Sequence, residues 1–236
     1  SICNISVLYR YDESNITYRK TNYIKKDYEF LKVKPEGMID LKKNYSQVWQ
    51  DIFALVVNDA KTDGTFLEIG GAQPFIGNNT YLLEGGYNWK GLSIELDHDL
   101  CAMWEGHRPN TTLFEADAVE FDYVKAVDDL GLPRHMDYLS FDLEPPQITL
   151  DTLRKFPLDK LSFNCITYEH DAYRQWGDVF GHREIFKQHG YDLVGENIMN
   201  GPCTMEEWYI HGTLNIVMRD KLRSKDCEAW ELLLDL

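Results

Sequence analysis

Two acidic residues and a pair of glycines in the first half of the chain have the types and the spacing of a nucleotide-binding site. Glu68 lies in a short apolar segment, residues 66–69, and Gly70 and Gly71 follow that segment directly. Glycine has no side chain, so backbone N–H groups in such a turn can approach a ligand closely. Glu95 ends the next apolar segment, where a carboxylate can accept hydrogen bonds from both hydroxyls of a ribose. This order of strand, glycine turn, helix and strand predicts a nucleotide-binding βαβ unit.

The glycine spacing distinguishes between two kinds of nucleotide. A dinucleotide site expects Gly-x-Gly-x-x-Gly, with the third glycine at the start of a helix that receives a pyrophosphate. This chain has Glu68-x-Gly70-Gly71 and then Gly77, and an acidic residue ahead of the glycines would repel a pyrophosphate. The same carboxylate suits the sulfonium and the amino group of S-adenosylmethionine. We therefore expect S-adenosylmethionine as the cofactor, and the alternatives are a dinucleotide and glycines that only turn the chain.

A series of motifs in fixed order resembles the FkbM-type methyltransferases over residues 45–214. The motifs are Tyr45-Ser46-Gln47, Gln50-Asp51-Ile52-Phe53, Phe66-Leu67-Glu68-Ile69-Gly70, Asn79-Thr80-x-x-Leu83-Glu84, Gly86, Trp89-x-Gly91, Ile94-Glu95, Asp137-Tyr138-Leu139-Ser140-Phe141-Asp142-Leu143-Glu144, Ile166-Thr167-Tyr168-Glu169-His170 and Glu207-Trp208-Tyr209. The resemblance implies an α/β fold of the class I methyltransferase (Rossmann-like) type, a seven-stranded mostly parallel sheet with helices on both faces. It also implies methylation of hydroxyls on sugars or small natural products. Two departures from the family lie at the cofactor rim, Pro145-Pro146 in place of a glycine and Gln73-Pro74-Phe75 in the glycine loop.

Hydrophobic periodicity divides the chain into two parts. Residues 1–44 are predicted as an N-terminal arm of irregular structure or short strands, and residues 45–236 as the methyltransferase domain. Apolar residues at 48, 49, 52, 53, 55 and 56 predict an amphipathic helix that Asn44 or Ser46 caps. Strands are predicted at 66–69, 91–94, 111–115, 136–141, 163–168 and 191–194, with a seventh, antiparallel strand at 214–218. Residues 195–212 are predicted as a long loop and residues 219–236 as a terminal helix.

The cofactor site is predicted at the carboxyl ends of these strands, where open α/β sheets bind their ligands. Asp117 and Ala118 follow the strand at 111–115, a position that faces the adenine in class I methyltransferases, and a plain surface aspartate is the alternative. The predicted cofactor-binding residues are Glu68, Gly70, Gly71, Asn79, Glu95, Asp117, Ala118 and Asp142.

Three residues at the ends of the fourth and fifth predicted strands are expected to carry the reaction. Asp142 and Glu144 alternate along an extended chain and should therefore point to the same side. His170 is the only histidine at a predicted strand end, and an ordinary pKa of about 6.5 makes histidine a usable base. We expect His170, oriented by Asp142 or Glu144, to take the proton of the acceptor hydroxyl. A structural histidine and a pair of helix-capping carboxylates are the alternatives.

Aromatic and polar residues beyond His170 are predicted to hold the acceptor. The apolar face of a sugar ring packs on aromatic rings, and the predicted substrate-binding residues are Tyr173, Trp208, Tyr209 and His211, together with Trp176. Ordinary core packing is the alternative for each of them. A divalent metal is the competing device and is not favoured, because the candidate ligands lack a metal-specific spacing; they are Asp142, Glu144, Glu169, His170 and Asp171.

Composition limits the partners that the chain can bind. Its 236 residues carry a formal net charge of −15, which disfavours nucleic acid and anionic membranes. No segment has the length and apolar character of a membrane span. Five widely spaced cysteines without a C-x-x-C pair indicate reduced thiols, no zinc site and a cytoplasmic location. Because the chain begins at Ser1, we expect a trimmed chain or a domain fused to or associated with other biosynthetic domains.

These observations predict an S-adenosylmethionine-dependent O-methyltransferase that acts on a hydroxyl of a sugar or glycan. The same reaction on a small natural product or peptide is the nearest alternative. A non-catalytic binding module with the S-adenosylmethionine fold and a nicotinamide-dependent oxidoreductase are the alternatives from other classes.

Overall fold

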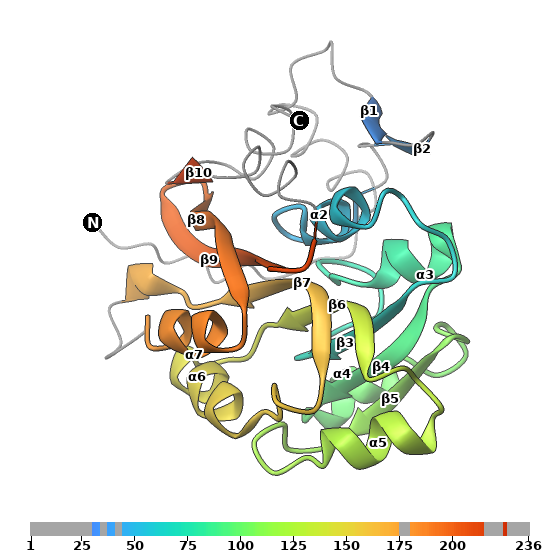
Figure 1. Ribbon diagram of the computed structural model, residues 1–236. Coiled ribbons are helices and arrows are strands. Elements are labelled where there is room, and N and C mark those ends of the chain that lie inside the picture. The colour runs from blue at the N-terminus through green and yellow to red at the C-terminus, as the bar shows by residue number, and fades with distance from the viewer. Residues whose placement is uncertain (1–29, 34–36, 41–43, 175–179, 215–223, 226–236) are drawn as a thin grey trace.

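A computed structural model describes residues 30–33, 37–40, 44–174, 180–214 and 224–225. An eight-stranded sheet with the strand order β10-β8-β9-β7-β6-β3-β4-β5 forms its centre (Figure 1). The parallel strands are β3 (Thr65–Ile69), β4 (Lys90–Glu95), β5 (Thr111–Glu115), β6 (His135–Phe141) and β7 (Ser162–Glu169). Strand β3 is buried at every position, because helices cover both faces of a parallel sheet.

Helices pack on both faces of the sheet (Figure 1). On one face lie α2 (Gln50–Val57) and α3 (Tyr81–Tyr87), and on the other α5 (Tyr123–Asp129), α6 (Pro146–Lys155) and α7 (His182–Gln188). The short helix α4 (His98–Ala102) contacts β4 and β5. Side chains alternate along each strand, so neighbours in sequence enter different cores. Phe66 and Tyr138 pack with α2 and α3, whereas Leu67 and Leu139 pack with α5 and α6.

The carboxyl-terminal part of the chain adds an antiparallel hairpin to the sheet, where a long loop was predicted. Strand β8 (Tyr191–Asn200) turns at Gly201 into β9 (Cys203–His211), and β9 pairs antiparallel with both β8 and β7. The prediction of an antiparallel seventh strand was correct in kind and wrong in place. Leu214 lies beyond the end of β9, and residues 215–218 of the predicted strand lie outside the described residues.

The segments at the two ends of the chain are described only in part. Strands β1 (Phe30–Val33) and β2 (Gly37–Asp40) form a separate antiparallel pair, and β10 (Ser224–Lys225) pairs parallel with β8. The predicted terminal helix at 219–236 falls almost wholly outside the described residues. Within the described ranges, no helix has the length and apolar character needed to cross a membrane.

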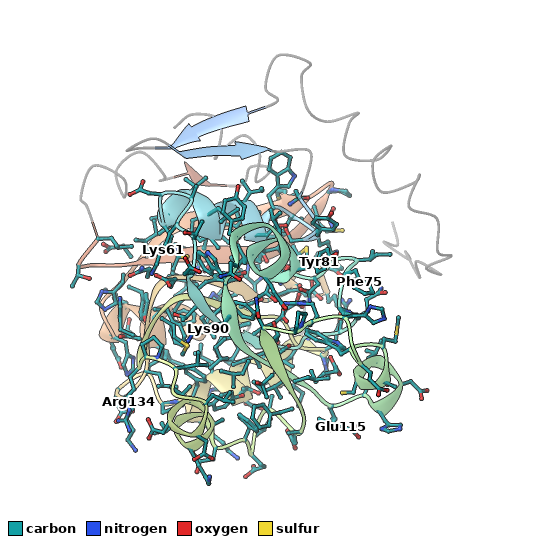
Figure 2. All side chains as sticks on the ribbon, turned by 90° about the vertical axis from the view of Figure 1, so that its right-hand side faces the viewer. Lys61, Phe75, Tyr81, Lys90, Glu115 and Arg134 are labelled. Atoms are coloured by element: carbon teal, nitrogen blue, oxygen red, sulfur yellow. The ribbon has the colours of Figure 1, made fainter. Side chains whose placement is uncertain are left out.

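The strand order identifies the fold. Apart from β10, the order is that of a doubly wound sheet, with an antiparallel strand inserted before the last strand, which is the class I methyltransferase (Rossmann-like) arrangement. This confirms the predicted fold class. All parallel strands end at one edge of the sheet: Phe75 and Tyr81 lie next to each other near this edge, while Lys61 and Arg134 lie toward the opposite edge (Figure 2).

Candidate active site

The glycine turn after β3 can be built only from glycine. Gly70 has a φ of +88°, and a Cβ atom there would lie 1.7 Å from the backbone oxygen of Asp142. A Cβ on Gly71 would lie 2.2 Å from Oγ of Ser93. The backbone N–H groups of Gly70 and Gly71 both donate to the carbonyl of Ile94, at 2.9 and 3.0 Å. The turn is therefore hydrogen-bonded to β4 and packed against the end of β6, next to the predicted cofactor site.

Glu95, the predicted ribose acceptor, holds the loop that follows the glycines. Its Oε2 accepts the N–H of Ala72 at 2.7 Å. Its Oε1 accepts the N–H groups of Leu96 and Asp97 at 2.8 and 2.9 Å. A carboxylate offers about four acceptor positions, so capacity for a further donor remains on this partly exposed side chain.

Glu68 lies beneath the glycine turn and is only 1% exposed. Its Oε2 accepts hydrogen bonds from Ser93 at 2.8 Å and from Asn78 at 3.3 Å. Burial raises the pKa of Glu68 to about 7, against the opposing charge of Arg108. Glu68 supports the glycine turn, and its predicted contact with the cofactor stays a prediction.

Asn79 and Asp142 meet where the start of α3 approaches the end of β6. The Asn79 amide donates to Ser140 at 2.9 Å and to Asp142 at 3.4 Å. Asn79 is 3% exposed, and its Oδ1 has no hydrogen-bond partner among the described residues. A buried acceptor without a donor is uncommon and is expected where a ligand binds. Two predicted cofactor residues are thus brought together beside the glycine turn.

Asp117 and Ala118 lie at the same edge, just after β5. The carboxylate of Asp117 is exposed and accepts the N–H of Val119 at 2.9 Å. Ala118 is buried, and its carbonyl accepts the hydroxyl of Tyr123 at 2.7 Å. These bonds fix the turn in which the adenine contact was predicted.

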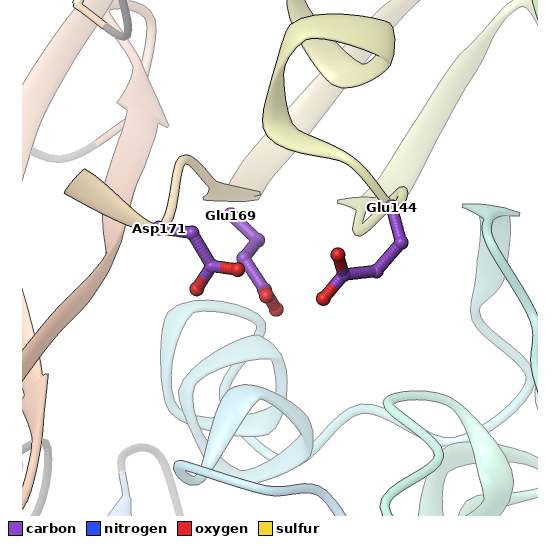
Figure 3. A group of neighbouring side chains, drawn as sticks. All are labelled: Glu144, Glu169 and Asp171. Atoms are coloured by element: carbon purple, nitrogen blue, oxygen red, sulfur yellow. The ribbon is translucent and has the colours of Figure 1, made fainter. Parts of the chain in front are cut away.

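A cluster of carboxylates lies at the ends of β6 and β7. The carboxylate oxygens of Glu144, Glu169 and Asp171 come within 4.8 Å of one another, and Figure 3 shows the three side chains converging on a common space. Glu169 also hydrogen-bonds Asp142. Burial raises the pKa of Glu169, and the charge of Asp142 adds to this effect. Such oxygens could hold a divalent metal.

Arg174 provides a positive charge at this cluster. Its guanidinium pairs with both carboxylate oxygens of Glu144, at 2.5 and 2.8 Å, and with Asp171 at 3.1 Å. Its Nε also donates to the hydroxyl of Tyr173 at 3.0 Å. Tyr173, a predicted substrate residue, therefore lies beside the acidic cluster, on the short helix η2 (Ala172–Arg174). Trp176 lies outside the described residues.

His170 does not join the carboxylates as predicted. Along β7 the side chain of Glu169 points to the face of Asp142, so that of the next residue points to the other face. There the imidazole of His170 stacks against His182 with ring centroids 5.7 Å apart, and its Nδ1 accepts the N–H of Ala172. Burial lowers the pKa of His170 to about 3. A base with this pKa and this orientation does not fit the proton transfer expected of it.

Trp208, Tyr209 and His211 do not form the predicted aromatic wall, because they lie on strand β9 and not in a loop. Trp208 is fully buried and stacks on Phe53 at 4.4 Å. Tyr209 is buried on the opposite face, where its hydroxyl donates to Glu207 at 2.6 Å. His211 lies at the other edge of the sheet, since β9 runs antiparallel and ends beside the start of β8.

Besides Arg174, two further residues at the site were not predicted. Arg108 is 5% exposed and lies behind the glycine loop. Glu206, at 1% exposed, accepts a hydrogen bond from Gln50 at 2.9 Å, and burial raises its pKa to about 8. An isolated arginine before a proline and a glutamate in an assumed loop gave no signal in the sequence.

No family model matches the chain, and a search of curated proteins finds no match. Many solved structures resemble it. Aeropyrum pernix fibrillarin with natively bound S-adenosyl-L-methionine is 12% identical over 80% of this chain and 85% of its own, with a TM-score of 0.49. A TehB-like SAM-dependent methyltransferase from Corynebacterium glutamicum is 16% identical over 71% and 89%, with a TM-score of 0.44. A SAM-dependent methyltransferase from Aquifex aeolicus is 16% identical over 70% and 90%, also at 0.44. Because these TM-scores are below 0.5, the fold assignment rests on the strand order of the sheet.

Proposed function

We propose that the protein is an S-adenosylmethionine-dependent O-methyltransferase that acts on a hydroxyl of a sugar or glycan. The observation that carries the proposal is the position of Asp142. Its backbone carbonyl packs against Gly70, and its carboxylate accepts a hydrogen bond from Asn79. A carboxylate is thereby held next to the glycine turn, at the edge where open α/β sheets bind ligands.

The residues around the turn fit the cofactor. Glu95 retains capacity to accept a ribose hydroxyl, and Oδ1 of Asn79 is a buried acceptor that lacks a donor. The nearby carboxylates favour a cationic ligand over a pyrophosphate. S-adenosylmethionine supplies a methyl group that an acceptor oxygen can attack, with a neutral thioether as the leaving group.

Asp142 and Glu169 form the acid–base pair of the proposal. Burial raises the pKa of both carboxyl groups, and the two share a hydrogen bond. Two adjacent carboxyls, one buried and one partly buried, retain one proton between them, which leaves the other group ionised. Asp142 lies nearer the turn and takes the proton of the acceptor hydroxyl, while Glu169 tunes and orients it.

The negative charge at this edge of the sheet limits the chemical classes of acceptor that can bind there. Glu144, Glu169 and Asp171 converge there, and Arg174 is engaged by two of them. Such a surface repels phosphate, which disfavours nucleic acids and phosphorylated acceptors. A neutral polyol such as a sugar can donate hydrogen bonds to carboxylates, and the ring of Tyr173 offers an apolar face for its C–H groups.

We expect catalysis without a metal ion, because Arg174 already neutralises part of the acidic cluster. Its guanidinium already compensates Glu144 and Asp171, two of the three carboxylates that a divalent ion would need. We expect transfer activity to be unchanged by a chelator. Loss of activity in the chelator and its recovery with magnesium or manganese would instead assign the cluster to a metal.

The test is transfer of a labelled methyl group from S-adenosylmethionine to a panel of sugars and glycans, with wild type and Asp142→Asn. We expect transfer by the wild type and a loss of 100-fold or more in kcat for the variant, the usual scale for a general base. Cofactor binding without transfer to any hydroxylated acceptor would favour a binding module. Protection against unfolding by a nicotinamide dinucleotide would favour an oxidoreductase.

A further inference from the structure

The loop between the glycine turn and α3 is held by one buried arginine. We propose that Arg108 is a positioning residue for cofactor binding, which sets the conformation of residues 72–80 and thereby the placement of Asn79. The inference rests on the proposed function, because it assigns Arg108 to the same cofactor site. Arg108 itself lies behind the loop and acts through it.

All the hydrogen-bonding capacity of Arg108 is used. A guanidinium has five N–H donors, and the side chain here is 1% exposed. The donors reach five acceptors on three elements: Glu84 at 2.5 Å, the carbonyl of Pro74 at 3.1 Å, Asn78 at 3.0 Å, Thr80 at 2.8 Å and Thr111 at 3.2 Å. The arginine thus ties the loop to α3 and to β5.

The loop contacts of Arg108 surround Asn79. Asn78 and Thr80 are the residues on either side of it, and both accept from the guanidinium. Asn78 in turn donates to the carbonyl of Gly71 at 3.0 Å and to Glu68 at 3.3 Å. One side chain therefore fixes the two neighbours of Asn79 and, through Asn78, the glycine turn.

Aromatic rings enclose the guanidinium and secure the other end of the loop. The guanidinium carbon lies 4.8 Å from the centre of the Trp104 ring and 5.7 Å from that of Tyr81. The indole N–H of Trp104 donates to the carbonyl of Ala72 at 2.8 Å. A planar guanidinium can stack between rings while it donates in its own plane, which an ammonium cannot do. Lysine should therefore fail to replace Arg108 even though it keeps the charge.

The test compares Arg108→Lys with a matched control, Arg134→Lys. Arg134 is also paired bidentately, with Asp128, but lies toward the opposite edge of the sheet. The measured quantities are the affinity for S-adenosylhomocysteine by calorimetry and, where transfer is detected, the KM values for S-adenosylmethionine and the acceptor and kcat. We expect Arg108→Lys to weaken binding tenfold or more and to raise the KM for S-adenosylmethionine by a similar factor. The KM for the acceptor should stay unchanged and kcat should stay within threefold, whereas Arg134→Lys should match the wild type.

A second pair of variants keeps the proposal testable if Arg108→Lys does not fold. Thr80→Val removes one loop acceptor of Arg108, together with the bond from the same hydroxyl to Asn78 at 3.2 Å, and preserves side-chain volume. Thr152→Val is its control, because Oγ of the buried Thr152 has no hydrogen-bond partner among the described residues. We expect a threefold to tenfold loss of S-adenosylhomocysteine affinity for the first and none for the second.

The outcomes separate the two claims. If the wild type binds S-adenosylhomocysteine and folded Arg108→Lys, or Thr80→Val, binds it with the same affinity, the role of Arg108 is overturned and the proposed function stays intact. A wild type that does not bind S-adenosylhomocysteine would overturn the proposed function, and the role of Arg108 with it. Equal losses in the affected variant and its control would show a general loss of stability and would also contradict the inference.

Discussion

The carboxylate of Glu95 accepts a hydrogen bond from the backbone N–H of Ala72 at 2.7 Å. This bond joins the end of β4 to the loop after the glycine turn, so the predicted ribose acceptor also shapes the cofactor loop. The two functions are compatible because a carboxylate has acceptor capacity beyond the three N–H groups that Glu95 already binds.

Replacement of Glu95 should therefore weaken cofactor binding. We expect Glu95→Ala to lose about 1.5–3 kcal/mol of S-adenosylhomocysteine affinity, the usual scale of hydrogen bonds to a charged group. Glu115→Ala is the matched control. Glu115 lies opposite Glu95 on the neighbouring strand β5, and its carboxylate contacts the imidazole of His98. Calorimetric titration measures both, and an unchanged affinity for Glu95→Ala would remove the ribose assignment.

The glycine turn gives a second prediction, on stability. Gly70→Ala would place a methyl group 1.7 Å from the backbone oxygen of Asp142 at a φ of +88°, so the backbone must move. We expect a loss of about 3 kcal/mol or more in unfolding free energy, beyond the usual range for single substitutions. Gly85→Ala in α3, where a Cβ meets nothing within 4 Å, should be neutral or stabilising by about 0.5–1 kcal/mol. Urea unfolding compares the two, and equal stabilities would contradict the tight packing of the turn.

The base assignment predicts different outcomes for two substitutions. His170→Asn keeps a side-chain acceptor for the N–H of Ala172 and should keep kcat within about threefold. The loss of stacking on His182 should lower the stability of the variant. Asp142→Asn should instead lose kcat by about 100-fold or more with little loss of cofactor affinity. Steady-state kinetics decides between them. A large kcat loss for His170→Asn with normal cofactor binding would restore the histidine as the base.

Buried carboxyls predict that stability falls as the pH rises. Burial raises the pKa of Glu68 to about 7 and that of Glu206 to about 8, so both groups favour the protonated form in the folded state. The stabilisation is complete below the unfolded pKa of about 4.3 and is lost as the pH rises through these folded values. Between pH 6.5 and 8 we expect a loss of about 2 kcal/mol in unfolding free energy.

His170 cannot cause this loss of stability between pH 6.5 and 8. The pKa of His170 is lowered to about 3, so its contribution has the opposite sign: the stability it affects rises as the pH rises through its ordinary value of about 6.5. Glu68→Gln keeps the volume of the side chain and should reduce the pH dependence. Urea unfolding at pH 6.5 and 8 measures the effect, and stability that is constant or rises over this range would contradict it.

The sequence predicted the parallel strands well and the carboxyl-terminal hairpin poorly. Strands β3, β4 and β6 are short segments rich in apolar residues that end at, or directly before, a glycine or an acidic residue, which is a strong local signal. Strand β9 carries Glu206 and Glu207 side by side, which is typical of a loop. Both are buried, because Glu207 pairs with His182 and Arg183 and because the raised pKa of Glu206 favours its neutral form. Such compensation depends on partners distant in the chain.

The candidate site was predictable only where it depends on local order. Gly70 follows β3 directly and Glu95 ends β4, so their places at the sheet edge could be inferred. The direction of His170 depends on the alternation of β7, and the role of Arg108 depends on partners in α3, β5 and the glycine loop. Neither is visible from the spacing of residues in the sequence.

Calorimetric titration of the wild type with S-adenosylhomocysteine, in a chelator and in magnesium or manganese, tests the central claim most directly. We expect binding at one site with the same affinity in all conditions, because the cofactor residues lie at the glycine turn and Arg174 compensates the acidic cluster. Absence of binding in every condition would contradict the methyltransferase assignment and leave the glycine turn with a structural role alone.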